Sequence, residues 1–459
     1  MLRATRIAEE QGIRAVAVVA QGFMAQARAT ASAMGAKGLF LATYPGVVPI
    51  DSHETFADKI WSSVLPSVLD SMQREAPALS ASVSEPSVHE IVVSGSLADV
   101  QEYFDAREWS DGLPIVPPTR ELVGEFLKWT TRNPGEVIGV LPAEFREATV
   151  WSVAVNGVMA GCRPEYMPIL LAAVDAIAAP EFRLADAGST PSWEPLVLVS
   201  GEIARRLKFN TEAGNMKVGR RANASIGRFL RLYLRNVAGF HPGTTDKGSI
   251  GYTFNVAMAE NEEAVRSLGW EPVRRDLGYA MDDNVVMVQS VVGISVPIYH
   301  GGNDGKTLAW PLLQYMTGTA GPYGYTPFVY GQWHPLILMS PAVARGFVDA
   351  GWGKADIRRY LFENCKVEAR MLEYYQMHVA GQEVSFVEMV QRGSAPASYA
   401  AFSGSNEKVP ALLREECTRI VVGGDPGRNQ SKIYLNNHEQ GPPVSRRIAL
   451  PADWRERIS

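Results

Sequence analysis

The first 75 residues alternate between helices and apolar strands, and this pattern is the strongest constraint on the fold. Two short runs, RAVAVVA at 14–20 and LFLATYP at 39–45, are almost entirely apolar. Strands that are apolar on both faces are typical of parallel sheets buried between helices. Helices are predicted before, between and after these runs, at 2–11, 23–35 and 53–72. The order helix, strand, helix, strand, helix predicts part of a doubly wound α/β domain.

Two strands are too few for an independent sheet. In doubly wound folds the ligand commonly binds at the loop that follows the first strand. That strand and its loop would precede residue 1. We therefore expect either that another polypeptide completes this sheet or that the chain begins in the middle of a domain.

A segment rich in Ser, Pro and Ala follows at 75–90 and is typical of a linker. It predicts a partial α/β domain at 1–75, a linker at 76–90 and a larger domain at 91–459. Strands of the larger domain are predicted at 90–96, 136–142, 195–201, 285–296 and 334–340, and on both sides of the glycine-rich turn 423–429. Helices lie between them without the regular repeat of a barrel, so we expect a mixed α/β or α+β domain.

Composition excludes several classes of function. A net charge of -5 argues against nucleic-acid binding, which needs a basic surface. Three widely spaced cysteines form neither a disulfide framework nor a zinc motif, and this pattern is typical of the cytoplasm. No run approaches the ~20 apolar residues of a membrane span, and the first residues lack the apolar core of a signal peptide.

The most distinctive helix candidate carries a stripe of arginines. Residues 222–237 contain no proline, and their apolar residues have helical spacing. Arg221, Arg228, Arg231 and Arg235 follow at steps of seven, three and four, which places them along one side of a helix. Such a stripe is either a solvated face with ion pairs or an anion-binding wall for a carboxylate or phosphate.

A polar, glycine-rich loop at 241–249 follows this helix, and such loops often carry functional residues. An enzyme of the lyase type needs an acid–base pair, for which His241 and Asp246 are the candidates. The candidate substrate-binding residues of the helix and loop are Arg221, Asn223, Arg228, Arg231, Thr244, Thr245 and Lys247.

Cys162 is a third candidate catalytic residue. It lies in GCRPEY (161–166), which breaks a helical stretch, and Arg163 beside it would lower the pKa of the thiol and favour the thiolate. The alternative is a small buried residue at a helix end, which is common for free cysteine.

The remaining motifs are less specific. His241, His300 and His334 show no metal-ligand spacing, so no metal site is predicted. The glycine-rich segments 299–306 and 423–429 offer backbone amides for an anion, but tight hairpin turns are the favoured interpretation. An aromatic segment is predicted either to line a pocket for an organic molecule or to form a packed loop over the core. It contains Trp310, Tyr315, Tyr323, Tyr325, Phe328, Tyr330 and Trp333.

Six stretches together resemble a known family: GIRAVAVVAQGFMAQARATASAMG, LFLATYPG, SDGLPIVPPT, VMAGCRPEYMP, GRRANASIGRFLRLYLRNVAG and AENEEA. The chain resembles the bacterial UGSC family, whose members are predicted thiol or selenol proteins named for a Sec/Cys-Gly-Ser-Cys motif. The resemblance covers most of residues 10–265 and is weaker beyond. The sequence contains no such motif, so the resemblance implies that a partner chain supplies the reactive thiol or that the larger domain performs different chemistry.

These observations lead to one main functional hypothesis. The chain is expected to be a subunit of a heteromeric enzyme that acts on a small anionic organic substrate, by thiol-dependent redox or lyase/hydratase chemistry. The thiol would come from a small partner protein or from Cys162, and no cofactor is identified. The alternatives are a non-catalytic scaffold subunit that completes a partner's sheet, and a metal-dependent lyase; homo-oligomerisation is the other partner hypothesis.

Overall fold

The protein, described by a computed structural model, has the mixed α/β fold that the sequence predicts. The described residues are 2–36, 38–48, 51–74, 89–187, 192–251, 253–319, 333–374, 385–393, 395, 397–412, 414–437 and 440–458. The predicted linker at 76–90 lies outside them except for its last two residues.

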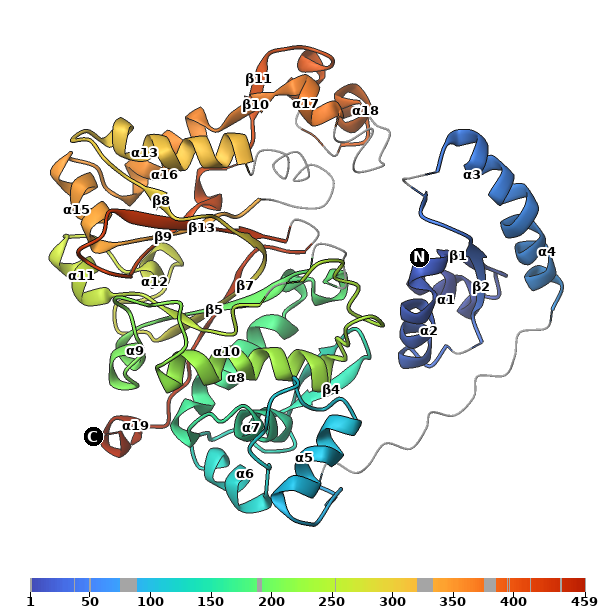
Figure 1. Ribbon diagram of the computed structural model, residues 1–459, viewed down its shortest axis with the longest axis horizontal. Helices are drawn as coiled ribbons and strands as arrows, with labels where there is room; N and C mark the ends of the chain where they lie inside the picture. The colour runs from blue at the N-terminus through green and yellow to red at the C-terminus, as the bar shows by residue number, and fades with distance from the viewer. Residues whose placement is uncertain are drawn as a thin grey trace.

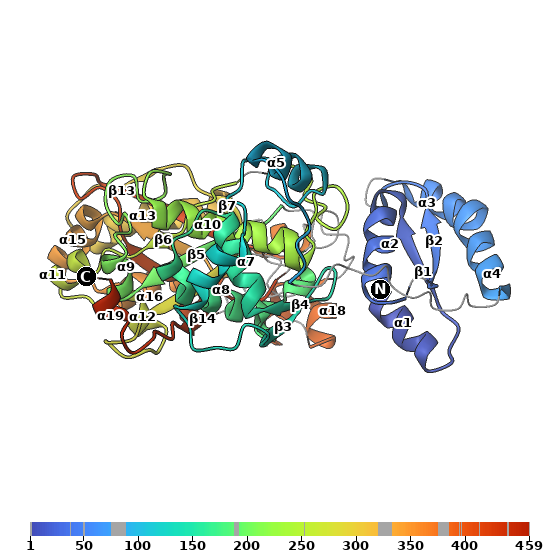
Figure 2. The same ribbon diagram turned by 90° about the horizontal axis from the view of Figure 1, so that it is seen from below.

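The N-terminal elements follow the predicted order. They are α1 (Leu2–Glu10), β1 (Val16–Ala20), α2 (Met24–Ala33), β2 (Phe40–Tyr44), α3 (His53–Lys59) and α4 (Leu65–Gln73). The π-helical turn Ile60–Val64 joins α3 to α4, so the helix predicted at 53–72 is continuous. β1 and β2 pair in parallel, and no other strand among the described residues joins them. Figure 2 shows this group of elements beside the larger part of the chain.

An eight-stranded mixed sheet forms the centre of the larger part, in the order β12-β9-β13-β7-β5-β6, with β14 paired to β7 and β8 to β13. Its strands are β5 (Glu194–Ser200), β6 (Met258–Ala259), β7 (Val285–Ile294), β8 (Ile298–Tyr299), β9 (Leu336–Met339), β12 (Arg419–Val422), β13 (Gln430–Asn436) and β14 (Val444–Arg447). Two small sheets pair β3 (Val137–Leu141) with β4 (Arg146–Thr149) and β10 (Lys366–Glu368) with β11 (Lys408–Pro410).

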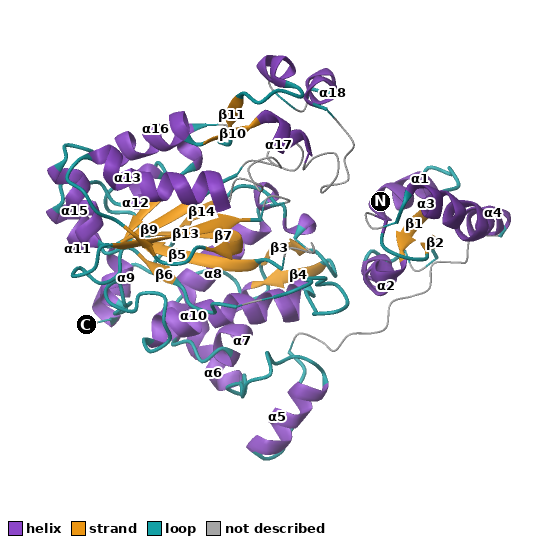
Figure 3. Cartoon of the chain, turned by 45° about the horizontal axis from the view of Figure 1, so that its top comes forward, coloured by secondary structure: helices purple, strands orange, loops and turns teal. Residues whose placement is uncertain are grey.

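Helices bury this sheet. Figures 1 and 3 show α8 and α10 beside β5 and β7, and α13 and α16 beside β9 and β13. The helices of the larger part are α5 (Leu97–Ala106), α6 (Arg120–Leu127), α7 (Val150–Met159), α8 (Met167–Ala178), α9 (Glu202–Arg206), α10 (Arg221–Tyr233), α11 (Glu262–Ser267), α12 (Val273–Asp276), α13 (Gly305–Gln314), α15 (Pro341–Asp349), α16 (Lys354–Asn364), α17 (Ala369–Tyr374), α18 (Phe386–Gln391) and α19 (Trp454–Arg457).

The packing of β5 explains why the strands of this sheet are continuous apolar runs in the sequence. Val197 and Val199 join the core formed with α7, α8 and α10. Leu196 and Leu198 point to the other face, where they pack with residues of β6, β7 and β9. Because alternate residues of a strand face opposite sides, a strand that is buried on both sides is apolar at nearly every position.

The predicted strand at 90–96 is wrong. This segment is irregular, and Ile91 is 63% exposed. A short apolar run gains the hydrogen bonds of a strand only when a neighbouring strand accepts them, and no described strand pairs with it.

The two predicted hairpin turns are wrong as well. β12 and β13 are not neighbours, because β9 lies between them, so 423–429 crosses over the end of β9. In 299–306, Asp304 caps α13 by accepting hydrogen bonds from Lys306 N and Thr307 N. The glycines therefore serve a crossover and a helix start.

The aromatic segment is only partly described. Trp310 is exposed on α13, whereas Trp333 is buried in the core beneath that helix. Its members between 320 and 332 lie outside the described residues. In the part of the chain that the structure describes, no helix combines the length and the apolar character needed to cross a bilayer.

Candidate functional site

Helix α10 carries the predicted arginine stripe and positions the candidate site. Its apolar side, which includes Ile226, Phe229 and Leu230, is fully buried. The π-helical turn Leu234–Ala238 extends it to Gly239, which adopts a left-handed φ of 81°. Figure 1 shows α10 running from the vicinity of α9 to β4. The buried side fixes the rotation of the helix, and therefore fixes what each arginine meets.

Arg228 holds a neighbouring segment in place. Its Nε and Nη2 donate to the two carboxylate oxygens of Asp111 at 2.9 and 2.7 Å. Nη2 also lies 3.2 and 3.0 Å from the carbonyl oxygens of Leu113 and Pro114. A bidentate arginine–carboxylate pair is strong and directional. Arg228 therefore commits its donors to the chain itself, and we leave it out of the proposed binding site.

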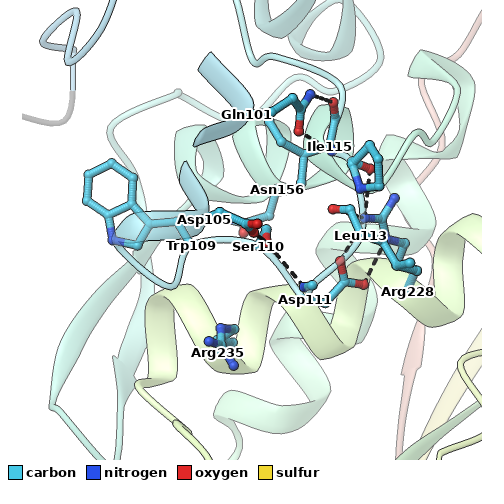
Figure 4. A network of polar contacts seen from close by, with 12 residues as sticks. Gln101, Asp105, Trp109, Ser110, Asp111, Leu113, Ile115, Asn156, Arg228 and Arg235 are labelled. Atoms are coloured by element: carbon cyan, nitrogen blue, oxygen red, sulfur yellow. Dashed lines mark hydrogen bonds and ion pairs between the residues drawn. The ribbon is translucent and has the colours of Figure 1, made fainter. Parts of the chain in front are cut away.

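The segment from Trp109 to Ile115 is anchored along its length (Figure 4). Gln101 of α5 exchanges two hydrogen bonds with the backbone of Ile115. Ser110 donates to Asp105, and Asn236 Nδ2 donates to Trp109 O at 3.1 Å. The SDGLP segment is thus a strap that joins α5 to α10, and Asp111 serves it as the partner of Arg228.

Arg221 and Asn223, at the other end of α10, hold neighbouring loops. Arg221 Nε donates to Gly161 O at 2.9 Å. Asn223 is fully buried, accepts from Asn210 N and donates to Ala257 O. Both side chains are hydrogen-bonded to backbone groups, so we leave them out of the proposed site.

Arg231 has different surroundings. Its Nη2 lies 3.4 Å from Glu194 Oε1 and 3.5 Å from Asp246 Oδ2. Both distances exceed the 2.7–2.9 Å of a tight charge-assisted hydrogen bond. The carboxylate side chains are 8% and 9% exposed, and that of Arg231 is 22% exposed. One guanidinium thus stands between two buried carboxyl groups without binding either closely.

This arrangement changes the protonation of Glu194. The pKa of Glu194 is raised to about 7: burial is the largest cause, the charge of Arg231 opposes it, and the charge of Asp246 adds to it. At neutral pH this carboxyl group is therefore present in both protonated and ionised forms. A group with a pKa near the working pH is suited to donate and accept protons.

The loop that carries Asp246 is firmly held. Thr245 is buried, donates to Gly239 O and accepts from His241 N at 2.8 Å. Asp246 Oδ1 accepts from Gly248 N at 3.0 Å. Thr245 therefore shapes the loop and does not face a ligand. These bonds place the Asp246 carboxylate toward Arg231.

Thr244 and Lys247 are the accessible members of the predicted loop site. Thr244 is exposed, and its hydroxyl donates to His241 O at 3.1 Å. The Lys247 ammonium lies 5.7 Å from the ring centroid of Phe23, which precedes α2. Gln26 of α2 donates to Thr245 O at 3.1 Å, so the N-terminal elements contact this loop.

His241 and Asp246 are joined through the backbone, since Asp246 N donates to His241 O at 2.9 Å. The imidazole lies elsewhere, with Nδ1 3.6 Å from Glu108 Oε2. Burial lowers the pKa of His241; Glu144 opposes this effect and Arg235 adds to it. The ring is therefore neutral at neutral pH and able to accept a proton.

The prediction of a reactive Cys162 thiolate is wrong. Burial raises the pKa of its thiol to about 12. A hydrogen bond with Ser225 and the charges of Arg221 and Arg228 lower it too little to compensate. The alternative interpretation, a buried residue at a helix end, fits the structure. The other two cysteines are also free and buried.

Sequence reasoning missed Glu194, Glu108 and Glu144. Glu194 begins an apolar strand, WEPLVLVSG, and a carboxylate at the start of a doubly buried strand is a usable signal. Glu108 and Glu144 reach His241 only through the fold. In the described ranges no cluster of three His, Cys, Asp or Glu residues is arranged to hold a metal ion.

Fold and site together define a mixed α/β protein in which an arginine separates two buried carboxyl groups. Comparison of the chain with protein-family models, with curated proteins and with solved structures gives no match.

Proposed function

We propose that this protein is an enzyme that binds a small organic carboxylate on Arg231 and transfers a proton through Glu194, in lyase or hydratase chemistry. One observation carries the proposal: the Arg231 guanidinium stands 3.4 and 3.5 Å from two buried carboxyl groups, one of which has a pKa of about 7.

The binding step follows from the long contacts of Arg231. A substrate carboxylate that takes the guanidinium at hydrogen-bond distance gains a charge-assisted, planar interaction. The added negative charge raises the pKa of Glu194 further, because like charges oppose ionisation. Substrate binding thus loads Glu194 with the proton that it then donates.

The reaction that fits is the loss of water from a hydroxy acid. Glu194 gives its proton to the leaving hydroxyl, and the proton on the adjacent carbon is released to solvent. The electron pair of the C–H bond forms the C=C bond, and water leaves. In the reverse direction ionised Glu194 activates the water. Asp246 positions Arg231 and is not required to transfer a proton.

The test uses malate, citrate and tartrate as hydroxy acids and succinate as a carboxylate without a hydroxyl. Isothermal titration measures binding, and proton NMR in D₂O measures exchange of the carbon-bound proton. Arg231→Gln is expected to weaken binding at least about tenfold, the effect of one lost charge-assisted interaction. Glu194→Gln is expected to bind and not to catalyse dehydration.

Arg220→Gln is the matched control, because Arg220 is an exposed arginine at the opposite end of the same helix. It should bind the hydroxy acids as the wild type does. Equal affinities of wild type and Arg231→Gln, or full turnover by Glu194→Gln, would refute the proposal.

A second candidate function, a subunit that completes a partner's sheet, is favoured by the N-terminal elements. β1 and β2 pair only with each other among the described strands, and Trp61 and Leu69 of the following helices are 70% and 53% exposed. Light scattering of the full chain should give an oligomer, and a variant lacking residues 1–74 should be monomeric. A monodisperse full-length monomer would contradict this candidate.

A further inference from the structure

A second basic site lies at the end of α10 that is opposite Arg231. A cavity of about 310 Å³ is lined there by Arg163, Arg206, Lys208 and Arg457, and, among the described residues, Glu165 is the carboxylate that lines it. Arg221, at the start of α10, is bonded to Gly161, two residues before Arg163. Ten residues of helix at about 1.5 Å each separate Arg221 from Arg231, so the two sites are distinct.

The four cations come from three parts of the chain. Arg206 ends α9 and Lys208 follows it, Arg163 precedes the short turn before α8, and Arg457 ends α19. The fold brings these three segments together at one cavity. Bringing four positive charges close together costs electrostatic energy unless negative charges neutralise them.

Carboxylates of the chain neutralise only part of this positive charge. Arg206 Nε is 2.6 Å from Glu202, Arg163 Nη1 is 3.6 Å from Glu165, and Arg457 Nη1 is 3.6 Å from Asp453. The Lys208 ammonium has no partner among the described residues. An excess of positive charge therefore remains at the cavity.

Arg457 is pre-organised. Its guanidinium lies 3.8 Å from the ring centroid of Trp129, and Nη1 donates to Lys128 O at 2.9 Å. Stacking and this bond fix the plane of the group, and fewer rotamers are lost when an anion binds. Tyr166 also lines the cavity. Burial raises the pKa of its phenol to about 12, so it stays protonated and able to donate.

Lys208 occupies an unusual backbone position. Its φ is 57°, and Phe209 N bonds to Ala204 O at 3.0 Å, as at the carboxyl end of a helix. Glycine is the common residue at such a position. A lysine is therefore present where the backbone favours glycine, and this residue lines the cavity.

We propose that this cavity binds a small phosphate ester, with Lys208 and Arg457 holding the phosphate and Arg163 and Arg206 supplying further positive charge. The charge of Lys208 that remains attracts a phosphate, whose three terminal oxygens accept from several donors at once. A cavity of this size lies at the lower end of the range for small-molecule sites, which suits a short phosphorylated metabolite.

The experiment is titration calorimetry of the full chain with glycerol 3-phosphate, inorganic phosphate and, as a dicarboxylate, succinate. Lys208→Gly is the central variant, because it removes the amine and suits the left-handed backbone. It should weaken phosphate binding about tenfold, as for one charged hydrogen bond, while the unfolding temperature of the unliganded protein stays the same or rises. Arg457→Gln should also weaken binding.

Lys217→Gly is the control, because Lys217 is exposed and does not line the cavity. It should bind glycerol 3-phosphate as the wild type does, and so should Arg231→Gln, which separates this site from the carboxylate site. Equal affinity in wild type and Lys208→Gly would overturn the proposal, as would binding of succinate but of neither phosphate compound.

Discussion

The raised pKa of Glu194 has a consequence for stability that can be measured without a substrate. Its carboxyl group has a pKa of about 7 in the folded protein and an ordinary value of 4.5 when exposed. Between these values the folded protein binds more protons than the unfolded chain does. Stability therefore falls as pH rises through this window.

The size of the effect follows from the two pKa values. Each pKa unit between folded and unfolded states corresponds to about 1.4 kcal/mol. The ionised carboxylate should thus destabilise the native protein by about 3 kcal/mol above pH 7 and by almost nothing near pH 4.5. Glu194→Gln removes the titration and keeps the shape. The variant should become more stable than the wild type as pH rises from 5 to 8.

The assay is urea unfolding of both proteins at several pH values, with the difference in free energy of unfolding plotted against pH. Glu202→Gln is a matched control on the neighbouring α9. Hydrogen bonding to Arg206 lowers the pKa of Glu202, so its loss should destabilise by a constant amount between pH 5 and 8. A flat difference for Glu194→Gln over this range would refute the reasoning.

Two further predictions follow from the contacts of α10. Arg228→Leu leaves the mostly buried Asp111 carboxylate without its bidentate partner, and should lower the free energy of unfolding by about 3 kcal/mol. It should also speed hydrogen exchange at 109–115, which mass spectrometry measures. Unchanged exchange in this segment would contradict its role as a strap. Because the Cys162 thiol is buried with a pKa of about 12, a chromogenic disulfide reagent should label this thiol only after unfolding, and rapid labelling of the native protein would contradict its burial.

Sequence patterns predicted the elements well where the signal is local. The doubly apolar run at 195–201 becomes β5, and the periodic stretch at 222–237 becomes α10 with its π-helical end. The order of strands was not predictable, because β9 enters between β12 and β13 from 80 residues earlier in the chain. The prediction of a strand at 90–96 was wrong for the same reason: a strand needs a neighbouring strand to pair with, and the local sequence does not identify one.

The partners of the arginine stripe were hidden from the sequence in a similar way. The sequence placed the stripe on one side of a helix, but left open whether carboxylates or a ligand would face it. Asp111 meets Arg228 from 117 residues away, and Glu194 meets Arg231 from another element. Cys162 was misjudged because the adjacent Arg163 suggested a thiolate, whereas burial in the folded core dominates its pKa.

The raised pKa of Glu194 follows from its burial together with its long contact with Arg231. Where an arginine approaches a more exposed glutamate closely, as Arg206 approaches Glu202 at 2.6 Å, the pKa of the carboxyl group is lowered. At 3.4 Å from Arg231 the attraction no longer offsets burial, so Glu194 keeps a proton near neutral pH. An anion that draws the guanidinium to itself weakens this attraction again. Ligand binding at Arg231 and proton uptake at Glu194 are therefore coupled, and a calorimetric titration in buffers of different ionisation enthalpy should detect the proton taken up.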